Sequence, residues 1–321
     1  MGSTLESVRI TRGFTQSRLE AASGVSQAAI SLIETGHQVM SDSVRDTLAA
    51  ALDVSPLLLG TLAPSVLIRH APQHSVPARA IKRVSAELTL AYVHVGLLAG
   101  NIRYDIAPRA LGEDLAPDRA IELRRKWNVG PGSVDDIVGL LEEHGIICLH
   151  RDLSGLRVNA IAATSEDGRA LMLLDPRADA DASRWAIAHE LGHLVMHDTS
   201  DRLNEASADE FAGEFLAPRT ELRARREAGD DIDDLVRLYR IPPADFARHA
   251  QRGRLVTVAE YRRLRRAPST HRTQLPGPAL LAETLRSRVF EDSIEDIAAS
   301  ALLTEESLQR DYLDGSRLRP A

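Results

Sequence analysis

The sequence has little cysteine and little lysine. Cys148 is the only cysteine among 321 residues, so no disulfide can form within the chain, and its place in the apolar run GIICLH predicts a small buried thiol. Lys82 and Lys126 are the only lysines, so arginine carries nearly all the positive charge. The formal net charge of −7 excludes a surface that attracts nucleic acid everywhere, and any DNA contact has to be local.

Long apolar runs are missing as well. The N-terminus MGSTLESVRITRG contains both acidic and basic residues and has no apolar core of signal-peptide length. Residues 54–68 are uncharged, but Pro56 and Pro64 interrupt them, and the stretch is shorter than the roughly 20 residues of a membrane-spanning helix. We therefore expect a cytoplasmic protein with no membrane anchor.

Turn formers and prolines divide the chain into segments. Apolar positions at helical spacing predict an all-α domain over residues 1–60. Prolines at positions 64, 72 and 77 predict a linker or an extended crossing strand over residues 61–78. We assign residues 79–266 to a second domain and residues 267–321 to a helical C-terminal segment.

The second domain has patterns of both helix and strand. Apolar periodicity predicts helices over residues 79–98, 117–127 and 133–144, and a further helix from about residue 180. Residues 145–150 and 156–175 indicate β-strands, the latter as two strands joined at SEDG. The predicted fold class is α+β, mostly helical, with a small β-sheet in the second domain.

The segment RWAIAHELGHLVMHDTSDRLNEASADEFAGEFLAP, residues 184–218, contains two histidines four apart. On a helix, His189 and His193 lie one above the other, so both imidazoles can bind one cation. Glu190 is rotated by about 100° from His189. That rotation is too large for a shared ligand role, but it lets the carboxylate meet a water on the open side of a metal, as a general base does. A solvated charged helix is the alternative, and the apolar face of this helix argues against it.

A hydrolytic Zn2+ site needs three protein ligands and a water. His197 lies about 12 Å along the helix from the first histidine, too far to share the ion, and Asp198 and Asp201 come too early to fold back easily. Glu205 begins the next predicted helix, which could return antiparallel to the first, and we take it as the third ligand. Asp209, one turn later, could accept the free ring N–H of a ligating histidine, although a simple surface charge is an equal alternative.

With these residues the segment is similar to the ImmA/IrrE family of zinc metallopeptidases, over about residues 120–250. The resemblance implies a zincin-like domain in which His189, His193 and Glu205 bind zinc and Glu190 is the catalytic glutamate. It also implies cleavage of a protein, often a repressor, during a stress or mobile-element response.

The stretch FTQSRLEAASGVSQAAISLIETG, residues 14–36, predicts a helix over residues 15–22, a turn at Gly24 and a second helix capped by Ser26. The stretch resembles the helix-turn-helix of the Xre/Cro/lambda-repressor family. By position, the resemblance implies that Gln16 contacts a phosphate. It also implies that three residues of the second helix face base edges in the major groove, namely Gln27, Ala28 and Ser31.

Charge limits the DNA affinity of this module. Residues 1–60 contain four arginines and six acidic residues, a balance of 4 − 6 = −2, whereas phosphate contacts supply most nonspecific affinity. We therefore expect a homodimer that binds two half-sites of an operator, with Arg69, Arg79, Lys82 and Arg83 adding contacts. The alternative is a module that pairs only with another protein.

The leading hypothesis is a DNA-binding regulator with a zinc endopeptidase domain that cleaves a repressor-type protein or its own 61–78 segment. The substrate would add as a strand at an edge formed by RALMLLD, which runs directly into the motif helix. Tyr239 and His197 are candidates for stabilising the oxyanion. The alternative is a repressor or antitoxin whose second domain binds a partner such as a toxin without cleaving it.

Overall fold

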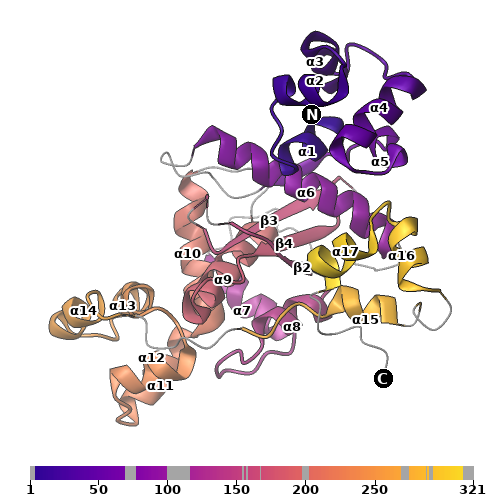
Figure 1. The fold of residues 1–321 in the computed structure, drawn as a ribbon. Helices are drawn as coiled ribbons and strands as arrows, with labels where there is room; N and C mark the ends of the chain where they lie inside the picture. The colour runs from indigo at the N-terminus through magenta and orange to yellow at the C-terminus, as the bar shows by residue number, and fades with distance from the viewer. Residues whose placement is uncertain are drawn as a thin grey trace.

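The structure is a computed structural model that describes most of the chain. The described residues are 4–68, 77–99, 116–153, 155–156, 158–166, 168–196, 202–268, 275–286, 288 and 292–313. Within them the chain is mainly helical, with one four-stranded sheet (Figure 1). This arrangement confirms the α+β, mostly helical fold class.

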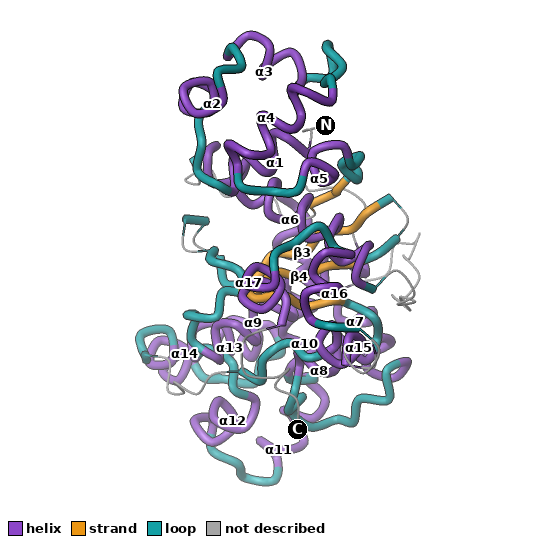
Figure 2. Tube along the Cα trace, turned by 45° about the vertical axis from the view of Figure 1, so that its right-hand side comes forward, coloured by secondary structure: helices purple, strands orange, loops and turns teal. Residues whose placement is uncertain are grey.

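Helices alone build the N-terminal domain within residues 4–60. They are α1 (Thr4–Thr11), α2 (Gln16–Ser23), α3 (Gln27–Glu34), α4 (Asp42–Leu52) and α5 (Pro56–Gly60). Leu19, Ile30 and Leu48 are fully buried at the centre of the domain. Figures 1 and 2 both show α3 at the end of the domain that lies farthest from the sheet.

Local capping fixes the helix-turn-helix. The side chain of Thr15 accepts a hydrogen bond from the Arg18 N–H at the start of α2, and that of Ser26 accepts one from the Ala29 N–H at the start of α3. Gly24 ends α2 with φ of 74°, in the left-handed region that glycine adopts without strain. The predicted helix-turn-helix is therefore confirmed.

A small mixed sheet forms the middle of the molecule. Its strands are β1 (Val66–Ile68), β2 (Ile147–His150), β3 (Ala160–Ser165) and β4 (Ala170–Leu174). The strand order is β1-β3-β4-β2; β3 is antiparallel to both β1 and β4, and β2 is parallel to β4. β1 thus gives the 61–78 segment a strand that joins the sheet.

The position of β4 corrects one prediction. We expected RALMLLD to form an edge on which a substrate strand could add. That expectation is wrong, because β3 and β2 occupy both hydrogen-bonding sides of β4. The sheet's outer strands are β1 and β2.

Both faces of the sheet are buried. Cys148 and Met172 pack in the core below the sheet, and Leu149 and Leu173 pack in the core above it, as the alternation of side chains along a strand requires. Cys148 is the buried thiol that the sequence predicts, and burial raises its pKa.

Helix α6 (Ala78–Leu98) covers the upper face. It contributes Leu88 and Val95 to the core it shares with the sheet, while Leu90 and Val93 join the core of the N-terminal domain. One helix therefore ties the N-terminal domain to the sheet.

Four helices lie on the other face: α7 (Ala116–Lys126), α8 (Ile137–Glu143), α9 (Ala180–Met196) and α10 (Arg202–Leu216). The helix predicted over 133–144 is shorter in the structure because Asp136 caps it, accepting a hydrogen bond from the Gly139 N–H. Gly192 lets α10 pass close to α9, since a Cβ atom there would lie 3.1 Å from Phe211.

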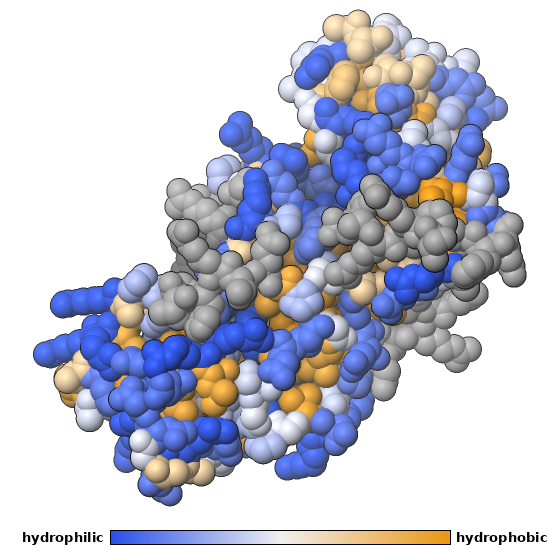
Figure 3. Space-filling view, turned by 60° about the horizontal axis from the view of Figure 1, so that its bottom comes forward, coloured by the Kyte–Doolittle hydropathy of each residue, from blue (hydrophilic) through white to orange (hydrophobic). Residues whose placement is uncertain are grey.

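The remaining helices form two groups. α11 (Arg219–Glu227), α12 (Ile232–Tyr239), α13 (Pro243–Arg252) and α14 (Val258–Leu264) follow α10, and α15 (Leu280–Arg286), α16 (Ile294–Ser300), α17 (Glu305–Leu308) and a π-helical turn, Gln309–Leu313, form the C-terminal segment. Leu285, Ile297 and Leu308 of that segment pack in the core with α6. None of the described helices has both the length and the apolar character needed to span a membrane. On the face in Figure 3, hydrophobic residues form separate patches among hydrophilic ones.

Candidate functional site

The crossing of α9 and α10 brings three predicted metal ligands together. His189 Nε2 lies 3.1 Å from His193 Nε2 and 3.2 Å from Glu205 Oε2, and His193 Nε2 lies 3.3 Å from Glu205 Oε1. His189 and His193 share one face of α9, and Glu205 comes from the first turn of α10. These three residues also form the one possible metal-binding group of histidine, cysteine or carboxylate side chains found among the described residues.

The spacing of these atoms fits zinc. Ligands bound at about 2.0–2.1 Å at the corners of a tetrahedron lie about 3.3–3.4 Å from one another, close to the distances observed. Two imidazole nitrogens and one carboxylate oxygen are also a donor set that zinc prefers in hydrolytic sites. The His193 side chain is fully buried, whereas that of Glu205 is 32% exposed. One side of the group is therefore open for a water or a substrate.

Asp209 lies where it can orient His189. His189 Nδ1 is 3.0 Å from Asp209 Oδ1, one turn along α10 from Glu205. A Nδ1–H that donates to this carboxylate leaves the Nε2 lone pair free for a metal.

The electrostatic environment of His189 favours a cation. Burial lowers its pKa, but hydrogen bonds with Asp209 and Glu205 and the charge of Glu190 raise it more, to about 10. The acidic groups therefore outweigh the cost of burying a positive charge.

Glu190 points from α9 toward the sheet. It is 2% exposed, and its Oε2 accepts a hydrogen bond of 2.8 Å from the backbone N–H of Ala162 in β3. β1 ends nearby, with Ile68 paired to Ala163. The carboxylate is thus held in a defined orientation beside the three predicted metal ligands and against β3, the strand that pairs with β1.

Asp245 is a further acidic neighbour of the histidine cluster. This residue lies in the first turn of α13; burial raises its pKa, Arg248 lowers it, and the charges of Asp209 and His189 also act on it. Asp245 therefore belongs to the acidic surroundings of the histidines. No motif in the sequence links IPPADF to HELGH, because only the packing of α13 against α10 brings them together.

Other candidates have different places. Tyr239 is fully buried, and the charged groups that act on its hydroxyl are Glu221, Arg225 and Arg124. None of these belongs to the histidine cluster, which gives Tyr239 no support as an oxyanion donor. His197, Asp198 and Asp201 lie outside the described residues.

The predicted base-contacting residues lie on the outer helix of the N-terminal domain. Gln27 and Ala28 are exposed, Ser31 is partly exposed, and Ser26 caps the helix. α3 projects away from the second domain (Figure 2), so neither the sheet nor the C-terminal segment covers it.

Gln16 has an internal partner. Its Nε2 donates to Glu34 Oε2 at 2.8 Å, and the guanidinium of Arg9 holds the same buried carboxylate. The amide group has a second N–H, which can donate a hydrogen bond to a phosphate oxygen. Gln16 is therefore preorganised at the start of α2.

Few positive charges face outward beside α3. Arg9 is paired with Glu34, and Arg45 with Asp42. Arg18 stands over the ring of Phe14, 4.5 Å from its centroid. This arrangement leaves the domain with little charge for nonspecific attraction to DNA.

Two family models match the chain. Residues 1–62 match a family described as a helix-turn-helix domain, and residues 141–250 match a peptidase family described as the IrrE N-terminal-like domain. The second match extends from α8 to α13 and contains every residue of the histidine cluster. The chain has no match among the curated proteins and none among the solved structures.

Proposed function

Because the chain joins a helix-turn-helix domain to an IrrE N-terminal-like domain, we propose that it is a cytoplasmic DNA-binding regulator with a zinc-dependent endopeptidase domain. His189, His193 and Glu205 are the zinc ligands, Asp209 orients His189, and Glu190 is the general base. The substrate is a repressor-type protein, or the chain itself, in a stress or mobile-element response.

The observation that carries this proposal is the group formed by His189, His193 and Glu205, in which the two Nε2 atoms lie 3.1 Å apart and each lies 3.2–3.3 Å from one of the two carboxylate oxygens. Glu190 is next to His189 in the sequence. Zinc bound there supplies a Lewis acid that activates water and polarises a peptide carbonyl. A structural zinc site has four protein ligands and no use for a base. Three ligands, an open side and an adjacent carboxylate support hydrolysis instead.

The chain's own groups provide the proton transfers. Glu190 takes a proton from the attacking water and passes it to the leaving amine. The N–H of Ala162 fixes the orientation of that carboxylate. Among the described residues, β1 pairs with β3 only from Ala163 to Ser165. An extended substrate that reaches Glu190 therefore lies beside Ala160 to Ala162 of β3, not along β4.

Glu190→Gln tests the peptidase. The amide keeps the size of the side chain but cannot accept the proton, so cleavage should fall by roughly 10²–10⁴-fold while zinc content and fold persist. The readout is mass spectrometry of the zinc-loaded protein, incubated alone and with the products of neighbouring genes. Glu210→Gln is the matched control, since Glu210 pairs with Arg219 and Arg252, away from the histidines. Cleavage at the wild-type rate by Glu190→Gln would show that this mechanism is wrong.

DNA binding is tested separately at α3. We propose that a homodimer binds its operator with Gln27, Ala28 and Ser31 at base edges. Gln27→Ala should reduce discrimination between operator and unrelated DNA by about 1–3 kcal/mol, with little change in nonspecific affinity. Gln251→Ala, in the second domain, is the control. If the full chain shows no preference for the DNA upstream of its own gene at low salt, the DNA proposal fails.

One observation favours a second function, a repressor or antitoxin that holds a partner such as a toxin without cleaving it. β1 covers the outer side of β3 from Ala163 to Ser165, and Glu190 is almost fully buried. A strand-shaped substrate therefore meets an occupied edge. Normal regulation in cells by the Glu190→Gln variant would support this second function.

A further inference from the structure

A large cavity lies between the N-terminal domain, α6, the sheet and the C-terminal segment. Its volume is about 820 Å³, within the range of roughly 300–1,000 Å³ that small-molecule sites have. It is separate from the histidine cluster, although Ile187 of α9 reaches its wall. Neither family match assigns a role to it.

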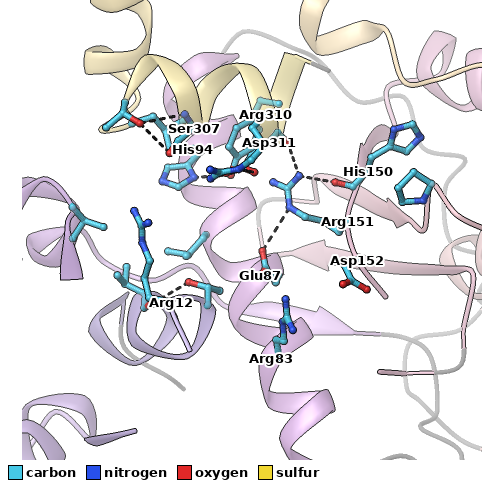
Figure 4. A pocket seen from close by; sticks show the side chains of 18 of the residues that line it. Arg12, Arg83, Glu87, His94, His150, Arg151, Asp152, Ser307, Arg310 and Asp311 are labelled. Carbon is cyan, nitrogen blue, oxygen red and sulfur yellow. Dashed lines mark hydrogen bonds and ion pairs between the residues drawn. The ribbon is translucent and has the colours of Figure 1, made fainter. Parts of the chain in front are cut away.

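Elements from every part of the chain line this cavity. Figure 4 shows Arg12 approaching from the N-terminal helices, and Arg151 at the end of β2. Arg83, Glu87 and His94 follow one another along α6. The C-terminal segment supplies the remaining wall, with Ser307, Arg310, Asp311 and Tyr312. A molecule in the cavity would therefore contact all three parts of the protein at once.

His94 presents an unsatisfied polar atom at this cavity. The residue is 5% exposed, and its Nδ1 is 2.6 Å from the hydroxyl of Tyr312. Its Nε2 is buried and has no hydrogen-bond partner among the described residues. Such atoms are rare in folded proteins and need a partner. Among the described residues that line the cavity, His94 alone has such an atom.

The acidic groups of the wall are mostly paired already. Asp152 and Asp175 bind Arg177, Glu87 lies 3.6 Å from Arg151, and Asp311 binds Arg310. Because Asp152 and Asp175 share one arginine, these four acids and their three partners sum to 3 − 4 = −1.

Two arginines of the wall have no such carboxylate partner. Within the described part of the chain, neither Arg12 nor Arg83 has a carboxylate within 4 Å in an ion pair, and Arg12 donates only to the backbone oxygen of Asp53. Asp53 is the one lining acid without an ion pair among the described residues, and Asp152 and Asp175 share Arg177, so the charged groups of the wall together with Arg177 sum to 5 − 5 = 0. Arg12 and Arg83 are therefore the guanidinium groups of the wall with which an anion can pair without displacing a carboxylate.

Apolar side chains make up much of the remaining wall. Val8, Leu58 and Leu90 come from the N-terminal side, and Leu275 and Leu302 from the C-terminal side. A small inorganic anion would leave these groups in water, whereas an organic anion covers them.

We propose that this cavity binds a small organic anion with an apolar body, whose charged end pairs with Arg83 and Arg12 and whose polar group hydrogen-bonds to His94 Nε2. The bound molecule holds the N-terminal domain against α6 and the C-terminal segment. It is therefore an effector that acts on the domain carrying α3.

Two fluorescent probes of similar shape test the site. 1-Anilinonaphthalene-8-sulfonate has an apolar body and one negative charge, and N-phenyl-1-naphthylamine has the same body without the charge. The full-length protein should bind one sulfonate probe per chain, more tightly than the neutral probe. Arg83→Ala should weaken binding of the sulfonate about tenfold and leave binding of the neutral probe nearly unchanged.

Matched variants locate the probe. Arg79→Ala lies one turn earlier on α6 and outside the cavity wall, so it should change neither affinity. Ala178→Trp fills part of the cavity at a partly exposed position and should weaken both probes. Hydrogen exchange of the α1 and α4 amides should slow when the sulfonate binds. These readouts use neither DNA nor cleavage, so they are independent of the proposed function.

Three results would overturn the proposal. The first is equal binding of the two probes, the second is binding that Ala178→Trp does not affect, and the third is no binding of the sulfonate by the folded wild-type protein.

Discussion

His94 is buried and His189 is largely buried, each on a long helix, yet their surroundings give them opposite properties. Around His189, the acids Glu205 and Asp209 help to raise the pKa to about 10 despite burial. Around His94, burial and the charge of Arg151 lower the pKa to about 4. The surroundings therefore favour the protonated imidazole at His189 and the neutral imidazole at His94.

This difference in pKa comes from the neighbouring charged groups more than from how deeply each histidine is buried. Carboxylates within hydrogen-bond distance outweigh desolvation at His189, whereas at His94 the nearby charge of Arg151 adds to it. The first region is therefore suited to a metal cation. The second is suited to a ligand that meets neutral donors and arginines.

Removing a carboxylate from the first region should have the largest effect. Glu205→Ala deletes one of the three proposed zinc ligands, so zinc affinity should fall by more than about 100-fold, beyond the loss expected for a residue that only orients a ligand. Elemental analysis and competition with a chelator measure it. His94→Asn and Glu210→Ala should leave zinc affinity unchanged. If Glu205→Ala binds zinc as the wild type does, Asp198, Asp201 and Asp209 become the candidates for the third ligand.

A smaller effect is expected at Asp209. Asp209→Asn keeps the shape of the side chain but removes the charge that orients His189, and zinc affinity should fall by roughly 10–100-fold. The same competition experiment measures it, with Asp234→Asn, at an exposed position of α12, as the control. An unchanged affinity would make Asp209 a surface charge and weaken the contrast with His94.

The smallest effect concerns stability and pH. The unfolded chain protonates His94 near pH 6.5, but the folded chain does so only near pH 4, so its contribution is lost as the pH falls between these values. From pH 7 to pH 5 this contribution amounts to about 2 kcal/mol. His94→Asn keeps an acceptor for Tyr312 and does not titrate, so urea unfolding should show a smaller loss for the variant. Equal losses would mean that His94 is not held neutral.

Local patterns predicted what lies close together in the chain. The capped turn at Ser26 and the histidine pair on α9 need only helix geometry and capping. The place of Glu205 follows if the next helix returns antiparallel to α9, which a short connection favours. Gly192 then permits the close crossing.

Long-range packing could not be predicted in the same way. The short apolar run ALMLL predicts that β4 is a strand, but not that β2 would pair with it in parallel and remove its free edge. The periodicity of α6 gives an apolar face, but not which of its residues join the N-terminal core. Asp245 and the cavity depend on contacts between segments far apart in sequence, and no local signal marks them.

β1 also acts as a short tether. Residues 61–65 alone separate α5 from β1, and five extended residues span at most about 18 Å. Any larger swing of the N-terminal domain would peel Val66 to Ile68 from β3 and uncover the strand edge beside Glu190. Conversely, a partner peptide that binds to that edge of β3 has to displace β1, whose effective concentration is of millimolar order. The length of the 61–65 connection thereby sets how far the N-terminal domain can move before the edge of β3 beside Glu190 is exposed.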